Sequence, residues 1–159
     1  MVELMGGGGL LRTIELLLVE DNPGDVKLTR EALREAGVAN NLTVARDGQE
    51  ALQVLTAGPG FENRVLPDLV LLDLNLPKLS GHEVLKRVKS DERLKSIPVV
   101  VLSTSNAARD ISTSYQSHAN CYITKPVDYD RFIELIQGLL QFWFEVVRLP
   151  SSDPGRGLR

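Results

Sequence analysis

Four short runs of mainly apolar residues constrain the fold more than any other feature. They are LLLV at residues 16–19, LVLL at Leu69–Leu72, VVVL at residues 99–102 and CYIT at Cys121–Thr124. Runs of this length, without the alternation of a half-exposed strand, are typical of strands buried on both faces. A fifth run, LTVAR at residues 42–46, alternates better and therefore predicts a more peripheral strand.

Helical patterns separate these five runs. The segment 23–37 has Asn22 as a plausible N-cap, Pro23 at the first helical position and Gly37 as a stop. Asp47 and Ser80 are the expected caps of helices over 48–58 and 81–94, a weaker pattern covers 107–119, and a last helix runs from 128 to about 148. Strands that alternate with helices predict a parallel sheet with helices on both of its faces.

Composition fits one domain and excludes several classes of function. The chain has 159 residues, and 18 Lys+Arg against 21 Asp+Glu give none of the basic character of a nucleic-acid binder. The single cysteine excludes an internal disulfide framework, and no segment is long and apolar enough to span a bilayer. We therefore expect a cytoplasmic protein with a flexible leader over 1–13 and a tail over 149–159, and with no membrane or nucleic-acid partner.

Polar residues follow four of the predicted strands, where the carboxyl ends of parallel strands form a common edge. The first strand leads to Glu20 and Asp21, the third to Asp73, the fourth to Ser103 and the fifth to Lys125. Alone, the Glu20–Asp21 pair would equally suit a solvated strand end or a helix start. With Asp73 added, three carboxylates need a cation, and a set without His or Cys favours Mg²⁺ over zinc.

Asp73 directly follows a buried strand, and Ser80 is a better cap for the next helix. Asp73 could therefore act as a nucleophile toward a phosphoryl donor and form an aspartyl phosphate. Lys125 and the Ser103 hydroxyl would contact phosphoryl oxygens, because phosphoryl transfer depends mainly on positioning and neutralisation of charge.

Four motifs carry a resemblance to a known family: LLVEDN, PDLVLLDLNLPKLSG, PVVVLSTS and YITKP. Over roughly residues 15–140 the chain resembles the response-regulator receiver domain of two-component signalling. The resemblance implies a flavodoxin-like doubly wound (βα)5 fold, with a five-stranded parallel sheet in the order 2-1-3-4-5, over residues 14–148. It makes Asp73 the phosphoacceptor, Ser103 and Tyr122 the switch residues, and Lys125 the site lysine.

The same resemblance implies the metal ligands and the partner. Glu20, Asp21, Asp73 and the backbone carbonyl of Asn75 would surround Mg²⁺, with Asp21 the favoured direct ligand over Glu20. The Lys125–Pro126 bond would be cis. EDNPGDVKLTREAL, CYITKPVDYDRF and FWFEVVRLP are also similar to regulators paired with phytochrome-type photoreceptor kinases.

We therefore expect a stand-alone phosphoacceptor that receives its phosphoryl group from a sensor histidine kinase and signals by protein–protein contact. It would be no enzyme beyond slow self-catalysed phosphotransfer and autodephosphorylation. Two alternatives remain: a phosphorelay intermediate, and a Mg²⁺-dependent phosphatase with an aspartate nucleophile. Asn75 argues against the phosphatase, because such enzymes usually have a second aspartate at that position as general acid.

The last helix predicts a homodimer. Its second half is apolar on nearly all sides, with Phe142, Trp143, Phe144, Val146 and Val147 as the expected interface. Burial of these residues under the N-terminal segment is the alternative. His82 and His118 have no partner at metal-ligand spacing, and they are interpreted as surface or helix-packing residues.

Overall fold

A computed structural model describes residues 13–147 and 149, except 59, 61 and 64. The leader predicted over 1–13 and the tail predicted over 149–159 therefore lie almost entirely outside the described residues. The elements are β1 (Ile14–Val19), α1 (Pro23–Ala36), β2 (Asn40–Ala45), α2 (Gly48–Leu55), β3 (Leu69–Leu72), α3 (Gly81–Ser90), β4 (Val99–Ser103), α4 (Ala108–Gln116), β5 (Cys121–Thr124), α5 (Tyr129–Gln141) and the π-helical turn η1 (Phe142–Val146).

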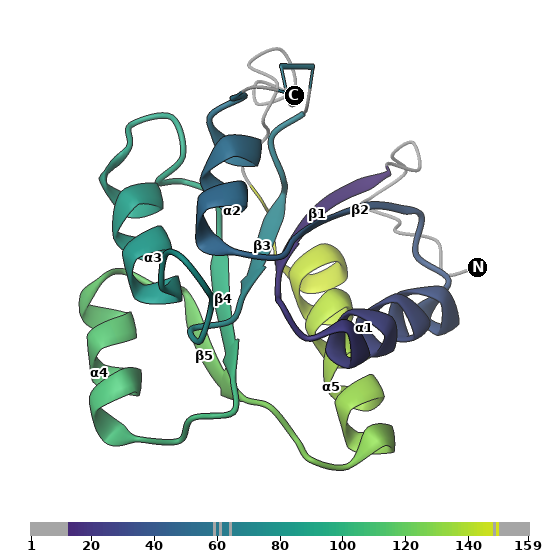
Figure 1. Ribbon diagram of the computed structural model, residues 1–159. Helices are drawn as coiled ribbons and strands as arrows, with labels where there is room; N and C mark the ends of the chain where they lie inside the picture. The colour runs from purple at the N-terminus through teal and green to yellow at the C-terminus, as the bar shows by residue number, and fades with distance from the viewer. Residues whose placement is uncertain (1–12, 59, 61, 64, 148, 150–159) are drawn as a thin grey trace.

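The five strands form one parallel sheet in the order β2-β1-β3-β4-β5, which confirms the predicted fold class and strand order. Helices α1 and α5 cover one face of the sheet, and α2, α3 and α4 cover the other (Figure 1). Each face buries its own apolar core. In the part of the chain that the structure describes, no helix is both long and apolar enough to cross a bilayer.

Local capping explains where the helices begin. The Asn22 side chain accepts hydrogen bonds from the Gly24 and Asp25 amides, while Asp47 and Ser80 cap α2 and α3 as predicted. Gly37 ends α1 in the left-handed conformation, with φ 67°. The predictions were too long for α2, α3 and α4, which end at Leu55, Ser90 and Gln116.

Strand β5 differs from its prediction. Its residues are partly buried or exposed, whereas the apolar run predicted a strand buried on both faces. The reason is its place at the edge of the sheet, because an edge strand has a neighbour on one side only. No cis peptide bond occurs among the described residues, so the implied cis bond at Lys125–Pro126 is not found.

The last helix changes its geometry after Gln141. The turn η1 is π-helical, and the Val147 amide donates to the Phe142 carbonyl at 2.9 Å. Trp143 and Phe144 pack, partly buried, against the core under α1 and α5, while Phe142 is 52% exposed. The residues expected at an interface therefore differ in their surroundings, because Trp143 and Phe144 give part of their surface to this core and Phe142 does not.

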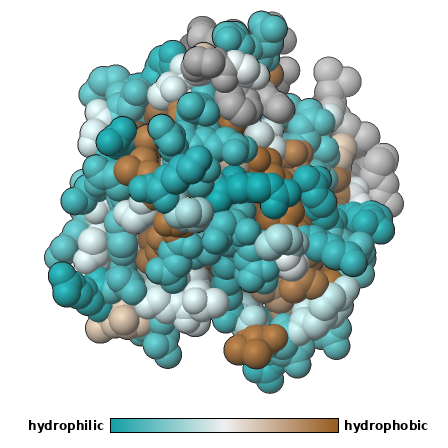
Figure 2. All heavy atoms as spheres, in the orientation of Figure 1, coloured by the Kyte–Doolittle hydropathy of each residue, from teal (hydrophilic) through white to brown (hydrophobic). Residues whose placement is uncertain are grey.

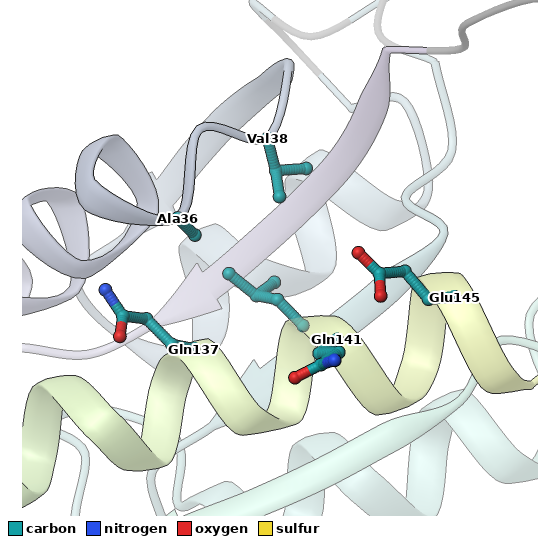
Figure 3. Close-up of a pocket in the computed structure, with 6 residues that line it drawn as sticks. Ala36, Val38, Gln137, Gln141 and Glu145 are labelled. Atoms are coloured by element: carbon teal, nitrogen blue, oxygen red, sulfur yellow. The ribbon is translucent and has the colours of Figure 1, made fainter. Parts of the chain in front are cut away.

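Figure 2 shows a mostly hydrophilic face with small, separate hydrophobic areas. At the end of the sheet where the strands begin, Figure 3 shows Gln137, Gln141 and Glu145 beside Ala36 and Val38. These residues line a cavity of about 280 Å³ between the end of α1 and the last helix.

Candidate functional site

The predicted site residues meet at the carboxyl edge of the sheet. Glu20 and Asp21 follow β1, Asp73 follows β3 and Lys125 follows β5; Figure 1 shows the β4–α4 and β5–α5 loops along the lower edge of the molecule. Carboxylate oxygens of Glu20, Asp21 and Asp73 lie within 4.8 Å of one another. Glu20 and Asp73 are buried and Asp21 is exposed, so the acidic group opens to solvent on one side.

Lys125 is the cation of this edge, and its ammonium contacts three carboxylates. It donates to Glu20 Oε1, to Asp25 Oδ2 at 3.0 Å and to Asp73 Oδ2 at 3.4 Å. The lysine side chain is nearly fully buried, at 5% exposure. A buried ammonium is stable only when it is paired, and these three contacts supply the pairing.

Charge is poorly balanced at this edge. Burial raises the pKa of Glu20 to about 8, and Asp73 adds to the increase while Lys125 opposes it. Burial disfavours the Lys125 ammonium, but hydrogen bonds and attraction from Glu20, together with Asp25 and Asp73, raise its pKa above the ordinary value. If Glu20 also loses its proton, one ammonium faces four carboxylates, counting the nearby Asp21, so the ionised site favours a further cation.

A divalent metal ion fits the donors that are present. Glu20 Oε2 is buried and has no hydrogen-bond partner within the described ranges. A buried polar atom is rarely left unpaired, so this oxygen needs a ligand. Three carboxylates, with no His or Cys among them, form a set of hard oxygen donors suited to a divalent cation that keeps several waters.

The two predicted switch residues both contact Ser105, in the loop that follows β4. Ser103 is fully buried, and its Oγ accepts a hydrogen bond from the Ser105 amide at 3.2 Å. The Tyr122 hydroxyl donates to the Ser105 carbonyl at 2.7 Å. The Asn75 amide lies 3.3 Å from Asp73 Oδ1, and its side chain is exposed.

Close packing fixes the backbone around Asp73. A Cβ atom on Gly81 would lie 2.2 Å from the Asp73 carbonyl oxygen, so only glycine permits this approach. The Gly81 amide donates to the Leu74 carbonyl at 2.9 Å. The start of α3 is therefore held directly against the segment that carries Asp73.

Asp25 is a site residue that the sequence reasoning missed. It lies in the first turn of α1, and its amide donates to Asn22 Oδ1 at 3.2 Å. The available signal was its place in EDNPGD, four residues after Asp21 and at the start of a predicted helix. Its carboxylate also lines an open hollow of about 590 Å³ between α1 and Tyr129 of α5.

The chain is similar to known proteins over most of its length. Residues 16–137 match the model of the response regulator receiver domain. The chain is 43% identical to the response regulator Rcp1 of Synechocystis sp. (strain ATCC 27184 / PCC 6803 / Kazusa) over 137 residues, which cover 86% of this chain and 93% of Rcp1.

Two solved structures are similar in fold and sequence. The phosphorylated cyanobacterial phytochrome response regulator RcpA superposes with a TM-score of 0.86 at 46% identity, over 88% of this chain and 100% of that one. The Mn²⁺-bound form of Rcp1 gives a TM-score of 0.83 at 43% identity, over 87% of this chain and 99% of that one.

Proposed function

The chain belongs to the response regulator receiver domain family, and we therefore propose that Asp73 accepts a phosphoryl group from a histidine kinase. The observation that carries the proposal is the convergence of Asp73, Lys125 and an acidic pair with an unpaired buried oxygen. Such an arrangement presents a nucleophile, a fixed positive charge and donors for a cation at one point.

Several residues of the chain have distinct roles in the proposed phosphoryl transfer. An Asp73 carboxylate oxygen attacks the phosphorus of a phosphohistidine, the P–O bond forms, and the P–N bond to the imidazole breaks. Lys125 contacts one phosphoryl oxygen as a point charge, and the buried Ser103 hydroxyl donates to another. We expect Glu20, Asp21, Asp73 and the Asn75 carbonyl to hold Mg²⁺, which would neutralise the remaining phosphoryl charge.

We propose that the signal then leaves the site through Ser103 and Tyr122. A phosphoryl group would attract the Ser103 hydroxyl and so break the hydrogen bond that Ser103 Oγ accepts from the Ser105 amide. Tyr122 contacts the same residue, because its hydroxyl donates to the Ser105 carbonyl. A ligand shifts a protein between two conformations only if it binds one of them more tightly. The phosphoryl group would favour the conformation in which these hydrogen bonds to Ser105 are rearranged.

The kinase is proposed from the relatives. RcpA is described as a phytochrome response regulator, and a phytochrome-type photoreceptor kinase is therefore the first candidate for this chain. The test is phosphotransfer from such a kinase, and from an unrelated sensor kinase, to wild type and to Asp73→Asn. Transfer to wild type that Asp73→Asn abolishes would support the proposal, and equal labelling of both proteins would contradict it.

We propose further that the chain forms a homodimer through β5, α5 and η1. A groove of about 570 Å³ on this surface is lined mainly by apolar side chains, among them Ile123, Leu135, Phe142 and Trp143. Phe142 meets Trp143 edge-on, with ring centroids 5.7 Å apart, and so extends an aromatic surface toward solvent. A two-fold axis would let the same surface cover itself.

Three of the five interface residues that the sequence indicated are partly buried within the chain itself. Trp143 and Phe144 give part of their surface to the core, and Val147 is partly buried. The side chain of Val146 is not among those that the structure describes. Among the described side chains of this set, Phe142 is therefore the most exposed and has the greatest need of a partner.

A further inference from the structure

Ser105 contacts both proposed switch residues and helix α4. Its amide donates to Ser103 Oγ at 3.2 Å, and its carbonyl accepts from the Tyr122 hydroxyl at 2.7 Å. Its own hydroxyl donates to Asp110 Oδ2 at 2.6 Å and accepts from the Ala107 amide at 3.2 Å. One loop residue therefore joins the switch to the first turn of α4.

Helix α4 has no ordinary side-chain cap. Its N-cap is Ala107, which makes no capping hydrogen bond, although most helices in this chain begin at Asn, Asp or Ser. The first amides of a helix need acceptors, and the Ser105 hydroxyl serves Ala107 while it holds Asp110. The β4–α4 loop and the start of α4 are thus connected by a short, charge-assisted hydrogen bond.

The second oxygen of Asp110 faces helix α3. Asp110 Oδ1 lies 3.4 Å from His82 Nε2, and His82 Nδ1 is buried without a hydrogen-bond partner in the described part of the chain. Figure 1 shows α3 and α4 as neighbours on one face of the sheet. His82 follows Gly81, which packs against the Asp73 carbonyl, so it belongs to a segment held at the phosphorylation site.

We propose that Asp110 is a positioning residue that couples the Ser103–Tyr122 switch to helix α4, with Ser105 as the connection and His82 as the fixed point on α3. The proposal rests on the proposed function and adds its route of output. When the Ser103 hydroxyl turns to a phosphoryl oxygen, the Ser105 amide loses its acceptor and the loop shifts. The Ser105–Asp110 bond passes that shift to α4, while His82 limits how far Asp110 follows.

Asp110 could instead act only as an acidic residue at a helix start, where the helix dipole favours it. Hydrogen bonding from Ser105, with His82 as a second contributor, lowers the pKa of Asp110 and keeps it charged in either role. The two roles differ in one consequence. A dipole effect changes the stability of α4 equally with and without phosphorylation, whereas a coupling residue changes the response to phosphorylation.

The experiment uses the full chain with Mg²⁺ and beryllofluoride as the phosphoryl mimic. Hydrogen–deuterium exchange of residues 108–116 is measured with and without the mimic, and mimic affinity is measured by titration. Asp110→Asn and Ser105→Ala should reduce the mimic-dependent difference in α4 exchange by about threefold to tenfold, the scale of one lost hydrogen bond. The affinity for the mimic should change far less.

Asp130→Asn is the matched control. Asp130 lies in the first turn of α5 and is exposed, so its change removes the same charge at a helix start without altering the β4–α4 loop. Asp130→Asn should keep the full α4 response. The double variant Ser105→Ala with Asp110→Asn should lose no more than either single variant, because both act on one bond.

The outcomes separate this inference from the proposed function. A full α4 response in Asp110→Asn, or a loss no larger than that of Asp130→Asn, would overturn the coupling role. If Asp110→Asn lowers the thermal midpoint too far for exchange measurements, Ser105→Ala decides alone, because it removes only a hydroxyl. Failure of wild type itself to bind the mimic would contradict the phosphoacceptor function instead.

Discussion

The Lys125 ammonium lies closer to Asp25, at 3.0 Å, than to Asp73, at 3.4 Å. The lysine expected to contact the phosphoryl group is therefore engaged elsewhere before that group arrives. Asp25 stands at the boundary between the buried edge and solvent, with 25% of its side chain exposed. We expect it to compete with the incoming phosphoryl group for the same ammonium.

Removing that competitor should favour phosphorylation. We expect Asp25→Asn to lengthen the lifetime of the phosphorylated protein by about two- to fivefold, the scale of a partly exposed ion pair. Decay of the radiolabelled aspartyl phosphate measures this lifetime. Glu31→Gln is the control, since Glu31 lines the same hollow but pairs with Arg34. A shorter lifetime in Asp25→Asn would show that Asp25 assists Lys125 rather than competing for it.

Metal binding should depend on Asp21, the exposed member of the acidic group. Asp21→Ala removes a carboxylate donor, leaves phosphoryl charge uncompensated and should abolish phosphorylation by the kinase. Excess chelator should have the same effect on wild type. Phosphotransfer at the wild-type rate in Asp21→Ala, or in wild type with chelator, would exclude the metal assignment.

Metal affinity should rise with pH because of Glu20. The folded, metal-free pKa is about 8 and the ordinary value is 4.5, so Glu20 retains its proton in the folded chain across this window. Metal must displace that proton, and affinity should increase by up to about tenfold per pH unit as pH approaches 8. Titration calorimetry at pH 6 and 7.5 measures the change, and Glu20→Gln should flatten it.

Protonation of Glu20 should also affect the free energy of unfolding of the metal-free protein. Between pH 4.5 and about 8 the folded state binds more protons than the unfolded state. The stabilisation that protonated Glu20 contributes is therefore complete below pH 4.5 and is lost as pH rises through about 8. Chemical unfolding in chelator should therefore show stability falling over this window, and less so in Glu20→Gln. A rise in stability over the same window, specific to wild type, would contradict the protonated Glu20.

Ser103 should be needed for the response rather than for the metal. Ser103→Ala removes the acceptor of the Ser105 amide and the donor expected for the phosphoryl group. We expect metal affinity to stay within about twofold of wild type, while phosphorylation-dependent partner binding weakens by about tenfold. Surface plasmon resonance with a partner, with and without beryllofluoride, measures both states. An unchanged response would exclude this coupling.

The dimer should depend on Phe142. Phe142→Glu places a charge on the exposed aromatic surface and should yield a folded monomer in sedimentation at micromolar concentration. Tyr115→Glu is a control, because Tyr115 is also an exposed aromatic but lies on α4, outside the α5 groove. A wild-type chain that is monomeric with and without beryllofluoride would contradict the dimer.

Local patterns in the sequence determined most of the fold. Short apolar runs predicted the five strands, and Asn22, Asp47 and Ser80 predicted three helix starts. Hydrophobic periodicity and capping act within a few residues, so they can be read along the chain. The edge carrying Glu20, Asp21, Asp73 and Lys125 followed as well, because parallel strands place their carboxyl ends together.

Only the tertiary structure decided which of these groups touch. Lys125 and Asp25 are 100 residues apart in the chain, and His82 and Asp110 are 28 apart, so no local spacing indicates either contact. The partial burial of Trp143 and Phe144 depends on a π-helical turn over the core, and the exposure of β5 depends on its place at the sheet edge. These features arise from packing between elements that are distant in the sequence. The hydrophobic periodicity of a single segment does not show which distant segment packs against it.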